Sequence, residues 1–101
     1  MTDQYIVISV EKDLEDLIPA YMSNRKKEVA TLRALLATGD FEQLHGIGHR
    51  MKGVGEPYGF NKVSSLGKLI QDSAKTRDRF GLETCINEYA DYLARVQIAY
   101  R

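Results

Sequence analysis

Residues 44–58 of the chain read LHGIGHRMKGVGEPY. Apolar residues recur in this stretch every three or four positions, which is the spacing of one face of an amphipathic helix. The predicted buried face consists of Leu44, Ile47, Met51, Val54 and Tyr58. At about 100° per residue, His49 lies roughly 170° from the centre of that face. The pattern therefore predicts a helix that packs through its apolar face and leaves His49 in water.

Three further segments have the helical period. A long helix is expected to start at Pro19, because proline suits a first turn, and to stop at Gly39, with Asp40 capping the next helix. Asn61 is expected to cap a third helix, and residues 76–81 to form a turn. The predicted buried face of the last helix consists of Leu82, Ile86, Tyr89, Leu93, Val96 and Tyr100. Four amphipathic helices joined by short loops indicate an all-α fold, an antiparallel four-helix bundle.

The N-terminal segment has a different pattern. Residues 5–10 are β-prone, but too few partner strands follow to build a sheet, so we expect an extended arm that lies against helices. Residues 11–17 are expected to form a short helix, and residues 55–59 to disturb or end the helix that carries His49. The even composition contains no repeat or linker, so residues 1–101 are expected to form a single domain.

Charge and cysteine usage restrict the class of protein. Fourteen basic residues balance 14 acidic ones, so no net field attracts nucleic acid or an anionic membrane. The one cysteine, Cys85, excludes an internal disulfide, fits a reducing cytosol and is expected to be a small core residue. No apolar run approaches the roughly 20 residues that cross a bilayer. We therefore expect a soluble, cytoplasmic monomer that binds neither nucleic acid nor membrane.

The residues around His49 suit phosphoryl transfer. An exposed imidazole is partly uncharged near neutral pH, so one ring nitrogen can act as a nucleophile. The reaction also needs positive charge near the phosphoryl oxygens, which Lys52 can supply from position i+3, with Arg50 on the flank. Gly46 and Gly53 bracket His49 on its own helix face and leave bare backbone beside the ring. A partner protein could then bring a reactive atom close.

Glycine is unusually frequent in this predicted helix. Each of Gly46, Gly48, Gly53 and Gly55 costs about 0.5–1 kcal/mol relative to alanine, and the four together cost roughly 2–4 kcal/mol. That sum is large against a typical stability of about 5–15 kcal/mol. Gly48 and Gly55 lie nearer the buried face, where they are expected to permit close approach of neighbouring helices.

The segment His49-Arg50-Met51-Lys52-Gly53 resembles the His-x-x-Lys-Gly signature of histidine phosphotransfer (Hpt) domains from bacterial two-component phosphorelays. The similarity extends to residues 17–22, 38–41 and 58–60 with the helix that follows. It implies a four-helix bundle whose exposed histidine accepts a phosphoryl group from a receiver-domain aspartate and passes it on or back. By position, His49 is the phosphorylated residue, Lys52 its electrostatic partner, and Gly53 the gap that admits the receiver.

The resemblance also implies the partners and the metal. The partner is a response-regulator receiver domain, a hybrid sensor histidine kinase, or both, and His45, Gly46, Arg50 and Gly53 are expected at the docking surface. The Mg²⁺ used in transfer belongs to the receiver, so no cofactor or metal is expected on this chain. It lacks the nucleotide-binding glycine-rich elements of a kinase, which makes it a phosphohistidine carrier rather than a self-standing kinase.

Two alternatives stay open at this point. The chain could be a non-catalytic module of the same fold that docks receivers or a kinase without carrying phosphate. It could also be a helical metal-binding protein, because His45 and His49 have the His-x-x-x-His spacing of zinc ligands. Only two ligands are evident for such a site, with Glu42 or Glu56 as candidates for a third.

Overall fold

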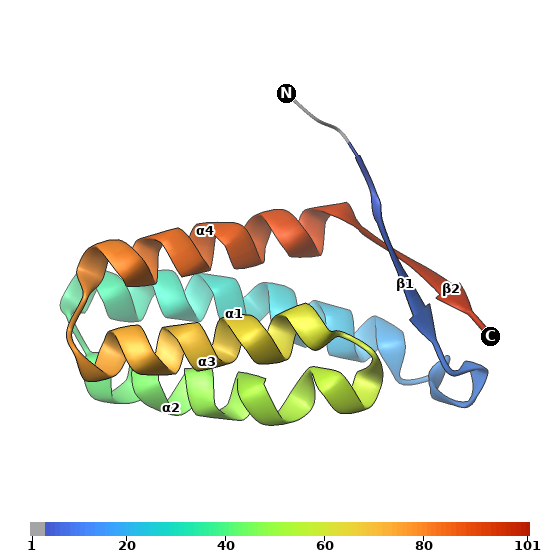
Figure 1. The fold of residues 1–101 in the computed structure, drawn as a ribbon, viewed down its shortest axis with the longest axis horizontal. Coiled ribbons are helices and arrows are strands. Elements are labelled where there is room, and N and C mark those ends of the chain that lie inside the picture. Colours follow the sequence, from blue (N-terminus) through green and yellow to red (C-terminus); the bar gives the residue numbers. More distant parts are fainter. Residues whose placement is uncertain (1–3) are drawn as a thin grey trace.

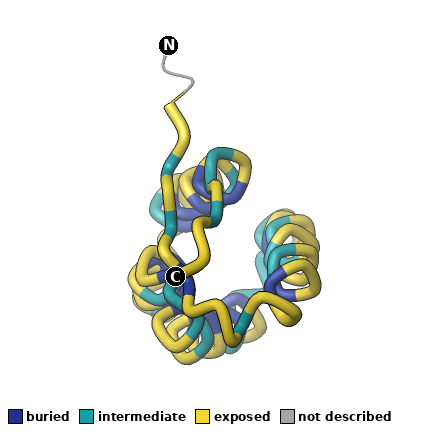
Figure 2. The backbone as a smooth tube through the Cα atoms, turned by 90° about the vertical axis from the view of Figure 1, so that its right-hand side faces the viewer, coloured by how far each residue is buried: buried dark blue, intermediate teal, exposed yellow. Residues whose placement is uncertain are grey.

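Figure 1 shows the chain as a computed structural model that describes residues 4–101. The protein is mostly helical, and its four α-helices are α1 (Ile18–Thr38), α2 (Phe41–Val54), α3 (Asn61–Lys75) and α4 (Arg79–Arg95). Shorter elements are the strands β1 (Ile6–Val10) and β2 (Val96–Tyr100) and the 3-10 helices η1 (Lys12–Leu14) and η2 (Glu56–Tyr58). The four helices lie side by side, and their buried residues face inward (Figure 2).

The connection between α1 and α2 follows the predicted signals. Pro19 lies in the first turn of α1, and Gly39 ends that helix in the left-handed conformation, at φ 72°. The Asp40 carboxylate then accepts a hydrogen bond from the Gln43 amide at 3.1 Å and caps α2. The Gly39 stop and the Asp40 cap are confirmed, because each depends only on local backbone geometry, and the helix that was expected to start at Pro19 starts one residue earlier.

The start of α3 differs from the prediction by one residue. Phe60, not Asn61, is the N-cap, and it makes no side-chain cap hydrogen bond. Phe60 is fully buried and stacks on the Tyr21 ring, with the ring centroids 4.9 Å apart. The predicted turn over residues 76–81 is also shorter, because Asp78 caps α4 by accepting from the Gly81 amide at 2.9 Å.

The two ends of the chain form a pair of parallel strands that the sequence did not predict. β1 pairs with β2 in a register that sets Ile6 opposite Val96 and Val10 opposite Tyr100 (Figure 1). The last helix therefore ends at Arg95, and the prediction that Val96 and Tyr100 continue its buried face was wrong. The N-terminal arm has a strand partner, and the predicted helix over residues 11–17 is reduced to η1 and a turn.

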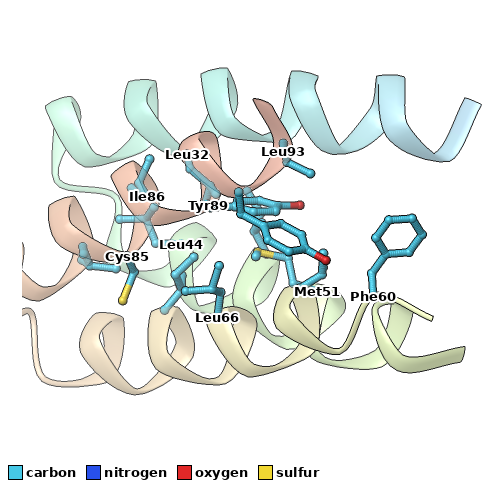
Figure 3. Packing of buried hydrophobic residues seen from close by; sticks show 14 of the residues in the cluster. Leu32, Leu44, Met51, Phe60, Leu66, Cys85, Ile86, Tyr89 and Leu93 are labelled. Carbon is cyan, nitrogen blue, oxygen red and sulfur yellow. The ribbon is translucent and has the colours of Figure 1, made fainter. Parts of the chain in front are cut away.

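An apolar core fills the space between the helices. Leu32, Leu44, Leu66 and Ile86 come from four different helices and are at most 1% exposed (Figure 3). Cys85 is a core residue as predicted, and burial raises the pKa of its thiol. The fold thus buries one cluster with contributions from every helix, which fixes the rotation of each helix about its own axis.

The backbones of α2 and α3 come into direct contact. A Cβ atom on Gly48 would lie 2.7 Å from the Gly67 carbonyl oxygen, and one on Gly67 would lie 2.6 Å from the Lys52 amide nitrogen. At Gly55 the corresponding distance, to the Ser64 amide nitrogen, is 2.5 Å. Neither helix can shift to admit these atoms without moving its neighbour. The predicted role of Gly48 and Gly55 in close helix approach is therefore confirmed.

Tyr21 joins α1 to the end of α2. Its ring stacks on Tyr58 with a centroid separation of 4.6 Å, and its hydroxyl donates to the Val54 carbonyl at 2.8 Å. Val54 is the last residue of α2, where carbonyl groups have no helical partner. Pro57 lies beyond it in η2, so α2 ends before the proline instead of being kinked by it.

Replacing Tyr21 by phenylalanine tests this connection. The variant keeps the stacked ring but leaves the Val54 carbonyl without its donor, so we expect a loss of about 1 kcal/mol in the free energy of unfolding. Urea unfolding followed by far-UV circular dichroism measures it. The matched control is Tyr58→Phe, because no hydrogen bond of the Tyr58 hydroxyl occurs within residues 4–101. Equal losses in the two variants would contradict the assigned hydrogen bond.

Candidate functional site

The orientation of α2 leaves His49 in solvent. Leu44, Ile47 and Met51 are 0, 4 and 0% exposed and hold the helix against the core. His49 is exposed, as its angular position predicts. Val54 and Tyr58, which the pattern placed on the same buried face, are only half-buried. The apolar face is therefore centred on the first three residues, and His49 lies on the far side of the helix.

The other predicted site residues lie around His49 on the same helix. Arg50, Lys52 and Gly53 are exposed, whereas His45 and Gly46 are half-buried. Lys52 follows His49 by three positions, which makes the two side chains neighbours on the helix surface. One stretch of α2 thus carries all six residues that the sequence selected, and Lys52 is the basic residue whose position on the helix makes it a neighbour of His49.

Open space surrounds the two glycines that bracket His49. A Cβ atom built on Gly46 or on Gly53 would meet no atom within 4 Å. Packing therefore does not require glycine at either position, in contrast to Gly48 in the same helix. The bare backbone predicted beside the imidazole is present, and the space above it is free for an approaching group.

Gln71 is a neighbour of His49 that was not predicted from the sequence. The Gln71 Nε2 atom of α3 lies 3.5 Å from Nδ1 of His49. Gln71 reaches this place because its backbone amide lies at the α2–α3 crossing, 2.7 Å from where a Cβ atom of Gly48 would be. The sequence does contain a signal for this contact. Gly48 and Gly67 mark the place where the two helices approach each other, and Gln71, four residues after Gly67, lies on the same face of α3.

This contact bears on which imidazole nitrogen is nucleophilic. As the structure has it, the Gln71 amide nitrogen faces Nδ1 and donates to it, because an amide nitrogen cannot accept. A half-turn of the carboxamide exchanges its nitrogen and oxygen; the oxygen would then accept from Nδ1–H, and Nε2 would keep its lone pair. No hydrogen-bond partner of Nε2 occurs within residues 4–101. Gln71 thus contacts Nδ1 and leaves Nε2 on the open side of the ring.

The described part of the chain contains neither a metal-binding group nor a membrane-spanning helix, and no relative of the chain was found. Within residues 4–101, no three His, Cys, Asp or Glu side chains are grouped closely enough to hold a metal ion. In the same part of the chain, no helix has the length and apolarity needed to span a membrane. No protein-family model matches the chain, and the searches of curated proteins and of solved structures found no match.

The two kinds of glycine in α2 respond differently to a methyl group. Gly46→Ala adds it in open space and removes backbone freedom from the unfolded chain, so we expect α2 to gain about 0.5–1 kcal/mol of stability. Gly48→Ala drives it into the Gly67 carbonyl, so we expect a loss of about 1–3 kcal/mol. Thermal and urea unfolding compare the two variants. Destabilisation by Gly46→Ala would show that the space beside His49 is not free.

Proposed function

We propose that this chain is an Hpt-type four-helix bundle that carries a phosphoryl group on His49. It receives the group from the aspartyl phosphate of a response-regulator receiver domain and passes it on or back within a phosphorelay. The observation that carries the proposal is an exposed imidazole, set between two glycines whose surroundings are open. The resemblance of residues 49–53 to the Hpt signature supports the same assignment.

The reaction is a displacement at phosphorus. The Nε2 lone pair of His49 attacks the phosphorus atom, a P–N bond forms, and the bond to the aspartate oxygen breaks to release the carboxylate. This step requires the Gln71 carboxamide to be turned so that its oxygen accepts from Nδ1–H, and the Nδ1 proton then stays in that hydrogen bond throughout. In-line attack requires the aspartyl phosphate to approach the ring closely, and the unoccupied space at Gly46 and Gly53 admits it.

Lys52 and Arg50 supply positive charge to this step. The transferring group spreads negative charge over three equatorial oxygens, and a nearby ammonium stabilises that charge. Lys52 is exposed one turn from His49. We assign Lys52 to the phosphoryl oxygens and place Arg50 with His45 on the surface that meets the receiver. The Mg²⁺ ion of the reaction is assigned to the receiver.

A phosphotransfer assay tests the central assignment. Incubation with a radiolabelled, phosphorylated receiver and Mg²⁺ is expected to place acid-labile phosphate on the chain, and His49→Gln is expected to abolish the label. His45→Gln is the matched control: it changes a histidine of the docking surface that carries no phosphate, so labelling should slow at most and not disappear. Profiling against every receiver encoded in the same genome identifies the donor.

Two results would contradict the proposal. The first is labelling that persists in His49→Gln, which would place the phosphate elsewhere. The second is receiver binding without any labelling of the native chain and without a change in His49→Gln. That second result would make the chain a docking module of the same fold.

Lys52→Ala tests the electrostatic contribution separately. We expect transfer to slow by about tenfold, equivalent to roughly 1.4 kcal/mol of barrier, because one charge near the phosphoryl oxygens is lost. Stability should change by less than about 0.5 kcal/mol, since the side chain is exposed. Rapid-quench kinetics and urea unfolding measure the two effects, with the exposed Lys27→Ala of α1 as control. Native transfer rates in folded Lys52→Ala would show that the lysine has no part in the reaction.

A further inference from the structure

One edge of β1 has no strand partner. Within residues 4–101, β1 pairs only with β2 (Figure 1). Just beyond the strands, the Arg101 amide donates to the Val10 carbonyl and the Lys12 amide donates to the Arg101 carbonyl, both at 3.0 Å. Successive residues of a strand direct their backbone groups to opposite edges. The amide and carbonyl groups of Tyr5 and Val7 therefore point away from β2.

This outer edge is closed at one end and open at the other. A Cβ atom on Gly59 would lie 3.2 Å from the Ser9 carbonyl oxygen, so the segment before α3 covers the edge at Ser9. That contact also shows independently that the backbone groups of the odd-numbered residues face away from β2. Within residues 4–101, no strand or loop pairs with the outward groups of Tyr5 and Val7, and both residues are 66% exposed. We call these outward groups the open edge of β1.

A pocket of about 480 Å³ adjoins the open edge. Gly59 both contacts the outer edge of β1 and lines the pocket, and Lys62 lines it from the start of α3. Ile6 and Ile8 form its apolar wall on the inner face of β1. Neighbouring strands lie about 4.8 Å apart, and side chains alternate between the two faces of a sheet. A strand added at the open edge would therefore run between β1 and the start of α3 and direct every second side chain into the pocket.

The charges that line the pocket favour an uncharged occupant. Lys62 pairs with Glu88 at 2.6 Å, and Arg95 pairs with Asp91 at 3.1 Å, so the four charges have partners within the chain. A charged side chain would lose hydration in the pocket and find no excess of opposite charge. An apolar side chain meets the apolar wall without that cost. Residues 5–10 are themselves uncharged, so the strand does not select a charged partner either.

A second copy of the chain fits this place less well than a separate segment. Two copies of β1 paired antiparallel about a two-fold axis would place both helical bundles on the same face of the shared sheet. Gly59 and Lys62 already occupy the space below the open edge, where the second bundle would have to lie. A single extended segment needs only the width of one strand.

We propose that the open edge of β1 binds an extended, uncharged segment of a partner protein as a third strand. The segment exchanges backbone hydrogen bonds with Tyr5 and Val7, and its alternate apolar side chains enter the pocket beside Ile6 and Ile8. The backbone bonds supply affinity, and the pocket selects apolar residues at every second position. The proposal does not rest on phosphoryl transfer, because no residue assigned to that reaction lines the pocket.

A titration of the ¹⁵N-labelled chain with the peptide acetyl-Thr-Leu-Thr-Leu-Thr-Leu-Thr-amide tests the proposal. We expect saturable downfield shifts of the Tyr5 and Val7 amide protons, which gain hydrogen bonds, and no comparable shift at Ile8, whose amide faces β2. The control acetyl-Leu-Leu-Leu-Thr-Thr-Thr-Thr-amide has the same composition without the alternation and should bind at least about fivefold more weakly.

N-methylated peptides test whether the segment binds through one edge. Methylation of the three leucine amides removes the donors of one edge of the bound strand, and methylation of the threonine amides removes those of the other. Only one of the two peptides should lose affinity, by at least about tenfold.

Two proline variants test which edge of β1 is open. Proline lacks the amide N–H, so Val7→Pro removes a donor from the open edge, whereas Ile8→Pro removes one from the ladder with β2. We expect Val7→Pro to unfold close to the native temperature and to bind the alternating peptide about fivefold more weakly. Ile8→Pro should unfold at a clearly lower temperature.

Four results would overturn the proposal. Equal unfolding temperatures of the two proline variants would show that the edges of β1 were assigned wrongly. The absence of saturable shifts, or equal affinity for the peptides with and without alternation or for the two N-methylated peptides, would exclude strand addition. Dimerisation in sedimentation equilibrium that Val7→Pro abolishes would assign the open edge to a second copy of the chain.

Discussion

The backbones of α2 and α3 meet at Gly48 and Gly67, and the geometry around His49 depends on that contact. It brings Gln71 to the imidazole, because a side chain at either glycine would push the helices apart. The rotation of α2 is fixed by burial of Leu44, Ile47 and Met51, each worth about 1.5–3 kcal/mol. Turning His49 inward would sacrifice most of that burial. The exposure of the histidine is thus a consequence of how the core packs.

The glycines of α2 are present for two unrelated reasons. At Gly48 the neighbouring helix leaves no room for a side chain, so the residue stabilises the fold. At Gly46 and Gly53 nothing in residues 4–101 approaches the position, and alanine would give a more stable helix by about 0.5–1 kcal/mol at each. A cost that packing does not explain, on the face that carries an exposed histidine, is what the proposed docking of a receiver domain would require.

Features that depend on residues close together in the chain could be predicted from the sequence, whereas those that depend on distant residues could not. The inward face of Leu44, Ile47 and Met51, the Gly39 stop and the Asp40 cap depend on residues a few positions apart, and they were predicted correctly. Residues 96–100 fit the spacing of the preceding helix and also alternate as a strand; pairing with β1, some 90 residues earlier, decides between the two. Gln71 was missed for the same reason, because its position beside His49 depends on the register between two helices.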